Sequence, residues 1–483
     1  MNMTNIAFVQ AERNMTLTEV FSVGSCVPNL TCGAAEKLAV TKFLLALTTA
    51  AIRPKTRREI EALDNAEVAR KVSSYLSENR SLFEMDGDNA FLQYSESEKA
   101  KPNPIEAFIP GLVAGNRGVI RSTEVLTKVT PADIARALLF AVILPFTGKK
   151  TDAHVWIDSS GQGKKKGFFT PALGMGGLVH TFVLGHTLLD TLRLNLVAEE
   201  ELIGTPFTAG LGIAPWEKKP TENNAAADDL RHSLMGRLVP MLRFARIDAD
   251  SIRLTYGVEP EADIDDPTVT TWIDEGKKKV ARMLAASHWQ ALASAFGFGS
   301  RGEELPLCRQ LQWCLPYAQT DSGFAGILMV GLRTTWNSGE QYFSTGDETF
   351  CLHLQVTGKE FDLKSKFSFL QKLTSAIYRC HSELQQCIEA TKLDDKPELK
   401  GNSSKAQIRG RVDLTVRAFV EDIPDLLRLT DPAEIEAYER EMAVRARDAI
   451  RQAVRTAGAK CLAYSGRIEL NVESFFKEEG EQQ

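Results

Sequence analysis

The sequence lacks any apolar run that approaches the ~20 residues needed for a membrane-spanning helix. The longest candidate, Ile134 to Phe146, is interrupted by Arg136. The N-terminal segment reaches Glu12 and Arg13 before a long apolar stretch forms, so neither a signal peptide nor a transit peptide is readable. We therefore expect a cytoplasmic protein.

Cysteine and histidine motifs are also missing. The eight cysteines form no C-x-x-C pair, and the seven histidines form no H-E-x-x-H or H-x-x-x-H spacing. No serine lies in a G-x-S-x-G motif. We expect reduced, mostly buried thiols. Composition and spacing predict no metal, no cofactor and no catalytic residue.

An excess of positive charge is absent as well. Lysine and arginine total 57 against 63 aspartates and glutamates, which gives a formal net charge of -6. This balance argues against a sequence-independent nucleic-acid coat protein, whose affinity comes from neutralising many phosphates. Local basic patches on an acidic body remain compatible with it.

The N-terminal part of the chain mixes helix and strand signals. Thr16 precedes Glu19 by three residues, which is the spacing of a capping box. Thr130 followed by Pro131 predicts another helix start, and Pro54 ends a helix over 33–52. Further elements are a buried segment over 179–197, strands over 241–247, 252–256 and 325–332, and an exposed linker over 215–229.

Beyond about residue 360 the pattern is helical. Asp431 and Pro432 predict the start of a long helix with apolar residues at helical spacing up to Gly458. The predicted fold is α+β, with a mixed N-terminal domain over 1–360 and an antiparallel helix bundle over 361–483.

The clearest basic motif is a glycine-rich loop over 161–167. Lys164, Lys165 and Lys166 precede Gly167, but no Gly-Lys-Ser/Thr ends the loop, so a Walker NTPase is excluded. Glycine allows the backbone to approach a polyanion, and the ammonium groups neutralise phosphates. A solvated lysine run on a flexible loop is the simpler interpretation. An enzyme that binds a phosphorylated ligand through this loop is the alternative function.

Two further segments carry basic or aromatic residues. Lys277, Lys278 and Lys279 follow Trp272, and a charged helix start would explain them equally well. The segment 333–339 is turn-prone and contains Arg333 and Trp336. An exposed indole is unfavourable unless it finds a partner. Trp336 packed back on its own domain is the more common outcome.

Several motifs resemble the large subunit of Cascade, the type I-E CRISPR surveillance complex, a family also called CasA. The block from Gly167 through Leu173 is similar to the family's glycine-rich G-F. The segments 181–185 and 187–196 are similar to its T-F-V-x-G and to the leucine-rich helix that ends in L-N, here at Asn195. Weaker matches lie at 16–21, 91–93, 215–216 and 331–333. Ala90 replaces the family's usual proline, and its N-terminal tryptophan-proline is missing.

The resemblance implies a non-catalytic subunit. It docks near the 5′ end of the crRNA, reads the protospacer-adjacent motif (PAM) in duplex DNA, starts unwinding and R-loop formation, and recruits the Cas nuclease-helicase. The implied partners are the crRNA, the other Cascade subunits, double-stranded target DNA and the nuclease-helicase, with no membrane.

The resemblance also suggests roles for individual residues. Gly167 matches the family's glycine loop, and Thr335, Trp336 and Asn337 match its three-residue wedge loop, where a glutamine is common in the middle. An aromatic ring at this position can part base pairs by stacking. Lys277, Lys278 or Lys279 is the best match for the minor-groove lysine. Asn116, Arg117 and Arg121 match the loop that inserts toward the crRNA and a neighbouring subunit.

Overall fold

The computed structural model of the protein describes residues 1–108, 129–144, 151–152, 177–221, 225–248, 251–261, 263–274, 276–280, 306–332, 334–337, 340–343, 349–355 and 431–456, and the single residues 369, 373, 426 and 429. The chain divides into two compact units. The first comprises Met1–Met283 and Pro306–Leu354, and the second comprises Leu284–Leu305 and Gln355–Gln483.

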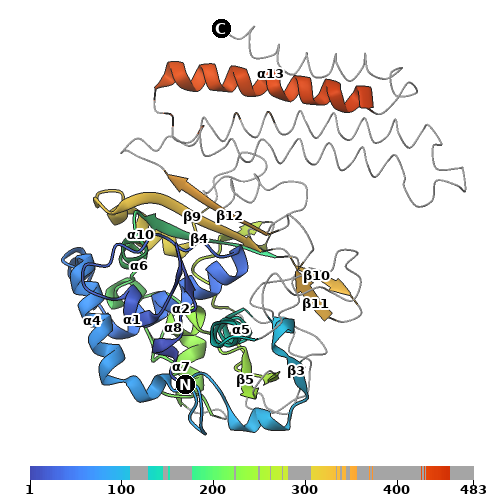
Figure 1. The fold of residues 1–483 in the computed structure, drawn as a ribbon. Helices are drawn as coiled ribbons and strands as arrows, with labels where there is room; N and C mark the ends of the chain where they lie inside the picture. Colours follow the sequence, from blue (N-terminus) through green and yellow to red (C-terminus); the bar gives the residue numbers. More distant parts are fainter. Residues whose placement is uncertain are drawn as a thin grey trace, which may run out of the picture. The chain divides into compact units, whose positions relative to one another are not determined.

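The core of the first unit forms around helix α2, Ala34–Ile52. Its side chains are buried on nearly all sides because it contacts helices α4 (Asn65–Glu78), α5 (Pro131–Ile143), α6 (Leu188–Leu194) and α8 (Met235–Leu238) and strand β9 (Phe324–Leu332) (Figure 1). The helix ends where Arg53 adopts the left-handed conformation before Pro54.

The predicted helix starts in this unit are confirmed. Thr16 and Glu19 form the capping box of α1, Leu17–Val20, and Thr130 caps α5 with Pro131 in the first turn. The other helices in the described ranges are α3 (Arg57–Glu61), α7 (Ala225–His232) and α10 (Arg309–Ala318), with 3-10 turns η1 (Met3–Asn5), η2 (Arg80–Phe83), η3 (Ser95–Lys99), η4 (Ile105–Phe108) and η5 (Glu199–Leu202).

Two three-stranded sheets pack against these helices. One has the order β12-β9-β4, with β4 at Leu178–Gly185 and β12 at Thr349–Gln355. Strands β4 and β9 are antiparallel and run from the pair Leu178↔Leu332 to the pair Gly185↔Phe324. The other sheet has the order β3-β6-β5, from β3 (Pro102–Pro104), β6 (Ser251–Tyr256) and β5 (Arg243–Asp248). Strands β1 (Val9–Gln10) and β2 (Asn14–Met15) form a small antiparallel pair.

The expected linker over 215–229 is wrong. Trp216 is 3% exposed, and its ring lies among Phe43, Phe83 and Phe91. The indole Nε1 donates to the Tyr75 hydroxyl at 2.8 Å, and helix α7 starts at Ala225. The polar composition indicated solvent exposure, but one aromatic side chain anchors this segment in the core.

In the second unit the structure describes helix α13, Pro432–Thr456. The Asp431 carboxylate accepts a hydrogen bond from the Ala433 amide at 2.9 Å, which confirms the predicted start. Met442, one of the expected apolar positions, is 1% exposed. The α+β class is confirmed, while the predicted bundle partners of α13 lie outside the described residues. No helix in the described ranges has both the length and the apolar content that a bilayer crossing requires.

Candidate nucleic-acid interface

Two hairpins of the first unit start at the same end of the β12-β9-β4 sheet. Leu332, the last residue of β9, pairs with Leu178, the first residue of β4, and strand β10 (Thr334–Asn337) follows. On the other edge of β4, Val269 forms an antiparallel bridge with His180, and β7 (Thr271–Asp274) begins two residues later. Strand β9 and the segment around Val269 both run antiparallel to β4, so each hairpin starts near the N-terminal end of β4.

The first hairpin pairs β10 with β11, Glu340–Phe343 (Figure 1). The register sets Trp336 opposite Gln341 and Asn337 opposite Glu340. The expected turn over 334–339 is therefore too long, because 334–337 are strand residues and only 338 and 339 connect the pair. Threonine and tryptophan favour strands, which explains the difference.

Sequence reasoning missed Gln341. The family resemblance expects a glutamine in the wedge and the sequence has Trp336 at that position, yet the hairpin register sets Gln341 directly across from it. The available signal was the Ser338-Gly339 dipeptide between the strand-favouring residues 334–336 and 342–343.

The second hairpin pairs β7 with β8, Lys277–Val280. Trp272 lies opposite Lys279 in the register, Ile273 opposite Lys278, and Asp274 opposite Lys277. The alternative of a charged helix start is wrong because the three lysines belong to a strand. Lys277 and Lys279 are exposed, and Ile273 is 70% exposed. The hairpin thus presents cations and an apolar side chain to solvent.

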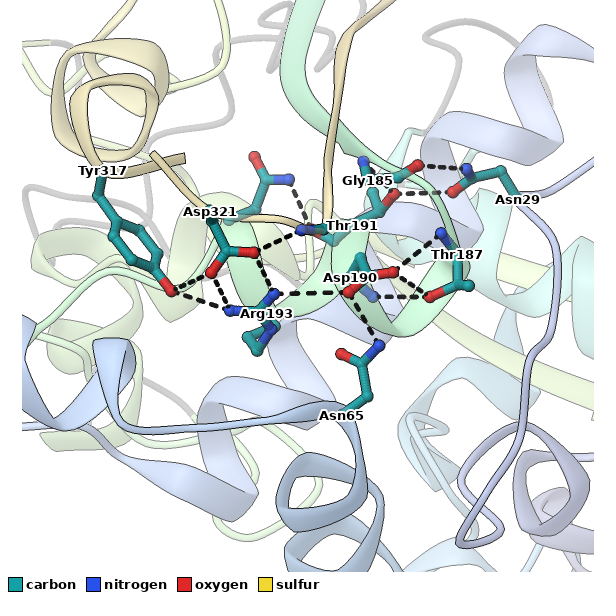
Figure 2. Close-up of polar contacts among 11 residues, drawn as sticks. Asn29, Asn65, Gly185, Thr187, Asp190, Thr191, Arg193, Tyr317 and Asp321 are labelled. Atoms are coloured by element: carbon teal, nitrogen blue, oxygen red, sulfur yellow. Dashed lines mark hydrogen bonds and ion pairs between the residues drawn. The ribbon is translucent and has the colours of Figure 1, made fainter. Parts of the chain in front are cut away.

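A buried polar framework holds the turn from β4 into α6 (Figure 2). The Asp190 carboxylate accepts two hydrogen bonds from Thr187, from its backbone amide at 3.1 Å and from its hydroxyl at 2.6 Å. It also accepts from the side-chain amide of Asn65 at 2.8 Å. Thr191 Oγ1 accepts from the Gly185 amide at 2.9 Å and donates to Asn29. These bonds fix the start of α6 against the end of β4.

The same framework holds the turn that leads into β9 (Figure 2). Arg193 donates from both terminal nitrogens to the two Asp321 oxygens, each at 2.7 Å, and from Nη1 to the Tyr317 hydroxyl at 2.9 Å. The hydrogen bond from Arg193 is the main reason that the pKa of Asp321 falls to about 2. Burial raises the pKa of Tyr317 to about 12. Bidentate pairing of this kind is among the strongest polar contacts in proteins.

The motif residues behind the family resemblance belong to this framework. A Cβ on Gly185 would lie 2.3 Å from the Asp190 Cβ, so only glycine fits. Asn195 Nδ2 donates to the Val183 carbonyl at 2.7 Å, and the Val183 amide donates to Asn195 Oδ1 at 3.0 Å. These residues therefore define the fold.

The remaining predicted site residues lie outside the described residues: Gly167, Lys164, Lys165, Lys166, Arg333, Asn116, Arg117 and Arg121. Gly177, the first described residue after the glycine-rich segment, immediately precedes β4 at the end where the two hairpins start.

The described part of the chain contains no group of three or more histidine, cysteine, aspartate or glutamate residues that could hold a metal ion. Cys26, Cys308 and Cys314 are free cysteines, which confirms the expected thiols at these three positions. Burial raises the pKa of Cys308 and of Cys314 to about 12.

Comparison with known proteins identifies this architecture. The family model described as CRISPR-associated protein Cse1 matches residues 6–457. Thermobifida fusca Cse1 is similar in structure, with a TM-score of 0.67 at 20% identity, over 99% of this chain and 98% of that one. Thermus thermophilus CasA (Cse1) gives 0.65 at 18% identity, over 99% of both chains. No curated protein sequence matches.

A chain in a structure described as a CRISPR RNA-guided surveillance complex is also similar, with a TM-score of 0.64 at 14% identity, over 98% of this chain and 99% of that one. The fold is that of the large α+β proteins that carry the names Cse1 and CasA. The family model covers nearly the whole chain, and the protein belongs to the CRISPR-associated Cse1 family.

Proposed function

We propose that the protein is the non-catalytic large subunit of a type I-E CRISPR RNA-guided surveillance complex. In this role it recognises the PAM in double-stranded target DNA, initiates unwinding and R-loop formation, and recruits the Cas nuclease-helicase. Its partners are the crRNA, the other Cascade subunits and the target DNA. Membership of the Cse1 family and the similarity to a chain of an RNA-guided surveillance complex support the proposal.

The observation that carries this proposal is that the two hairpins start at the same end of strand β4. Lys277 and Lys279 lie on one hairpin and Trp336 on the other, and both hairpins start at the N-terminal end of β4. Lysine side chains contact phosphates and, in the minor groove, can also reach base edges, whereas aromatic residues act on the base stack. One end of one sheet thus supplies both functions that motif recognition and strand separation require.

The two hairpins divide these tasks. Lys277, Lys278 and Lys279 approach the minor groove, where the donor and acceptor pattern is degenerate and recognition is tolerant. Thr335, Trp336 and Asn337, with Gln341 across the register from Trp336, form the wedge.

The segments outside the described residues complete the interface. Gly167 with Lys164, Lys165 and Lys166 approaches the duplex backbone, and Arg333 lies between β9 and the wedge. Asn116, Arg117 and Arg121 dock on the crRNA and a neighbouring subunit. The net charge of -6 suits a protein that touches DNA through loops and hairpins alone.

The test replaces Trp336 in the assembled complex. Trp336→Ala lowers the affinity for target duplex with a matching PAM by roughly 5- to 150-fold, because one base–aromatic stack contributes about 1–3 kcal/mol. Trp336→Phe is the matched control, since it keeps a ring that can stack. Binding is measured by gel shift, and unwinding by the permanganate reactivity of thymines next to the motif.

The proposal makes a distinct prediction for DNA that needs no unwinding. A target with a preformed bubble next to the motif restores most of the affinity of the Trp336→Ala complex. If Trp336→Ala binds and unwinds duplex as well as the unmodified complex does, the assignment of the wedge is wrong.

A further inference from the structure

The segment that precedes hairpin β7–β8 is fixed by contacts from four elements. We call residues 264–270 the hairpin base. The backbone amide of Gln310 in α10 donates to the Pro267 carbonyl at 2.8 Å, and the backbone amide of Thr181 in β4 donates to the Thr268 carbonyl at 2.8 Å. Arg237 of α8 donates from Nε to the Ile264 carbonyl at 3.1 Å. The fourth element is α2.

Helix α2 reaches the hairpin base with a buried lysine. Lys42 is 2% exposed, and its ammonium donates to the Arg237 carbonyl at 2.9 Å and to the Asp266 carboxylate. Burial alone would raise the pKa of Asp266, but Lys42, His180 and the hydrogen bonds from Lys42 and Thr268 lower it to about 2. The two side chains form an ion pair in which the lysine is buried and the Asp266 side chain is 23% exposed.

Thr268 and His180 extend this ion pair toward β4. The Thr268 hydroxyl donates to Asp266 Oδ1 at 2.7 Å and lies 2.8 Å from His180 Nδ1. Since the hydroxyl proton is directed at the carboxylate, its oxygen accepts from Nδ1–H of a neutral imidazole. Burial, assisted by Lys42, lowers the pKa of His180 to about 3. His180 Nε2 is buried and has no hydrogen-bond partner among the described residues.

Stability is a poor explanation for such a cluster. Lys42 is removed from water and Asp266 is largely removed from it, so both lose hydration that their attraction only partly restores. Apolar residues of similar volume often replace such a pair at no net cost. Compared with apolar contacts, an ion pair with hydrogen bonds restricts the orientation of the segment that carries it more strictly. Thr271, the first residue of β7, lies one residue beyond the hairpin base, and Lys277 lies six residues beyond Thr271.

We propose that Lys42, Asp266, Thr268 and His180 form a positioning cluster that sets the direction in which hairpin β7–β8 extends from the hairpin base. Lys42 acts as a positioning residue for Lys277 and Lys279, whose contact with DNA belongs to the proposed function on which this inference depends. The cluster makes motif discrimination depend on a residue that never touches DNA.

The experiment uses a charge-neutral double variant, Lys42→Met with Asp266→Asn, in the assembled complex. Met approximates the length of the lysine stem, and Asn keeps an oxygen that accepts from the Thr268 amide and hydroxyl. The readout is the ratio of affinities for duplex targets with matching and altered PAM. We expect this ratio to fall at least about fivefold, while the melting temperature changes by no more than about 4 °C.

Two further variants make the outcome decisive. Lys277→Ala with Lys279→Ala removes the hairpin charges directly. Thr268→Val, which is nearly isosteric and removes only the hydroxyl, replaces the double variant if the latter fails to fold.

The positioning role is overturned if the cluster variant keeps the ratio while the hairpin variant lowers it, and the proposed function then survives. It is equally overturned if the cluster variant melts at a much lower temperature and discriminates normally, because the cluster would then serve stability alone. If neither variant changes the ratio, the motif-reading role of the hairpin fails as well, because phosphate contacts alone would weaken binding to both targets equally.

Discussion

The polar framework around α6 and the hairpin β7–β8 hold their charged residues in opposite ways. In the framework, Arg193 has 7% side-chain exposure and contacts Asp321, Asp190 and Tyr317. In the hairpin, Lys277 and Lys279 are exposed. A charge with fixed protein partners serves the fold, whereas a charge left in solvent on a two-stranded hairpin is available to a ligand.

This difference explains which kind of residue carries the family resemblance. Gly185 and Asn195 carry the resemblance and are confined by their buried neighbours. Trp336, which we propose as the wedge residue, lies on a hairpin. In this chain the motif residues Gly185 and Asn195 thus belong to the framework and not to the surface proposed to contact DNA.

The largest effect is expected from a methyl group placed in the framework. Gly185→Ala puts a Cβ 2.3 Å from the Asp190 Cβ and 2.6 Å from the Thr191 amide nitrogen. Because backbone surrounds the site, the free energy of unfolding should fall by about 3 kcal/mol or more. Chemical denaturation monitored by tryptophan fluorescence measures it.

Gly33 provides the control for this substitution. It caps α2 at φ -56°, and a Cβ there would meet nothing within 4 Å. Gly33→Ser adds a capping hydroxyl and should leave stability unchanged or slightly higher. Equal destabilisation by both substitutions would contradict the distinction between the framework and its surroundings.

An intermediate effect is expected from pH. The pKa of His180 is about 3 in the folded protein and near 6.5 in an unfolded chain, so the unfolded state binds more protons between these values. Stability should therefore fall as pH drops from about 6.5, by at most about 1.4 kcal/mol per pH unit. Asp266 adds a loss in the same direction only below about pH 4.

Melting temperatures between pH 7 and pH 4.5 isolate the contribution of His180. His180→Asn should show a smaller loss over this range than the unmodified protein. His186→Asn removes an exposed histidine six residues away and should follow the unmodified protein. Parallel curves for all three proteins would show that His180 does not stay neutral in the fold.

Local signals predicted much of this structure. Thr16, Thr130 and Asp431 were identified as helix caps because capping depends on residues within one turn. The strands near 243–248, 251–256 and 324–332 followed from their apolar and β-branched residues. What is encoded within a few residues could be predicted from a single sequence.

Contacts between distant segments could not be predicted in this way. Trp216 reaches Tyr75, and Lys42 pairs with Asp266, which lies 224 residues further along the chain. For the candidate interface, the sequence singled out Lys277–Lys279 and Trp336 but did not show that their hairpins start at one end of β4. That relation depends on the pairings Leu178↔Leu332 and His180↔Val269, which join segments far apart in sequence.

The smallest effect is expected from the hairpin charges, and it concerns binding alone. Lys277→Ala with Lys279→Ala should leave the melting temperature unchanged, since both side chains are exposed. Each phosphate contact contributes about 0.9 to the slope of log K against log salt concentration, so the slope for the assembled complex on target duplex should decrease by about 1 to 2.

Lys99→Ala with Lys101→Ala is a matched control, because these exposed lysines of the same unit are also two residues apart. If the slope changes equally in both variants, Lys277 and Lys279 act only through the overall electrostatic field of the protein and do not contact phosphates directly. A change confined to Lys277 and Lys279 would mean that two solvated charges meet two phosphates, which is the property that separates this hairpin from the framework.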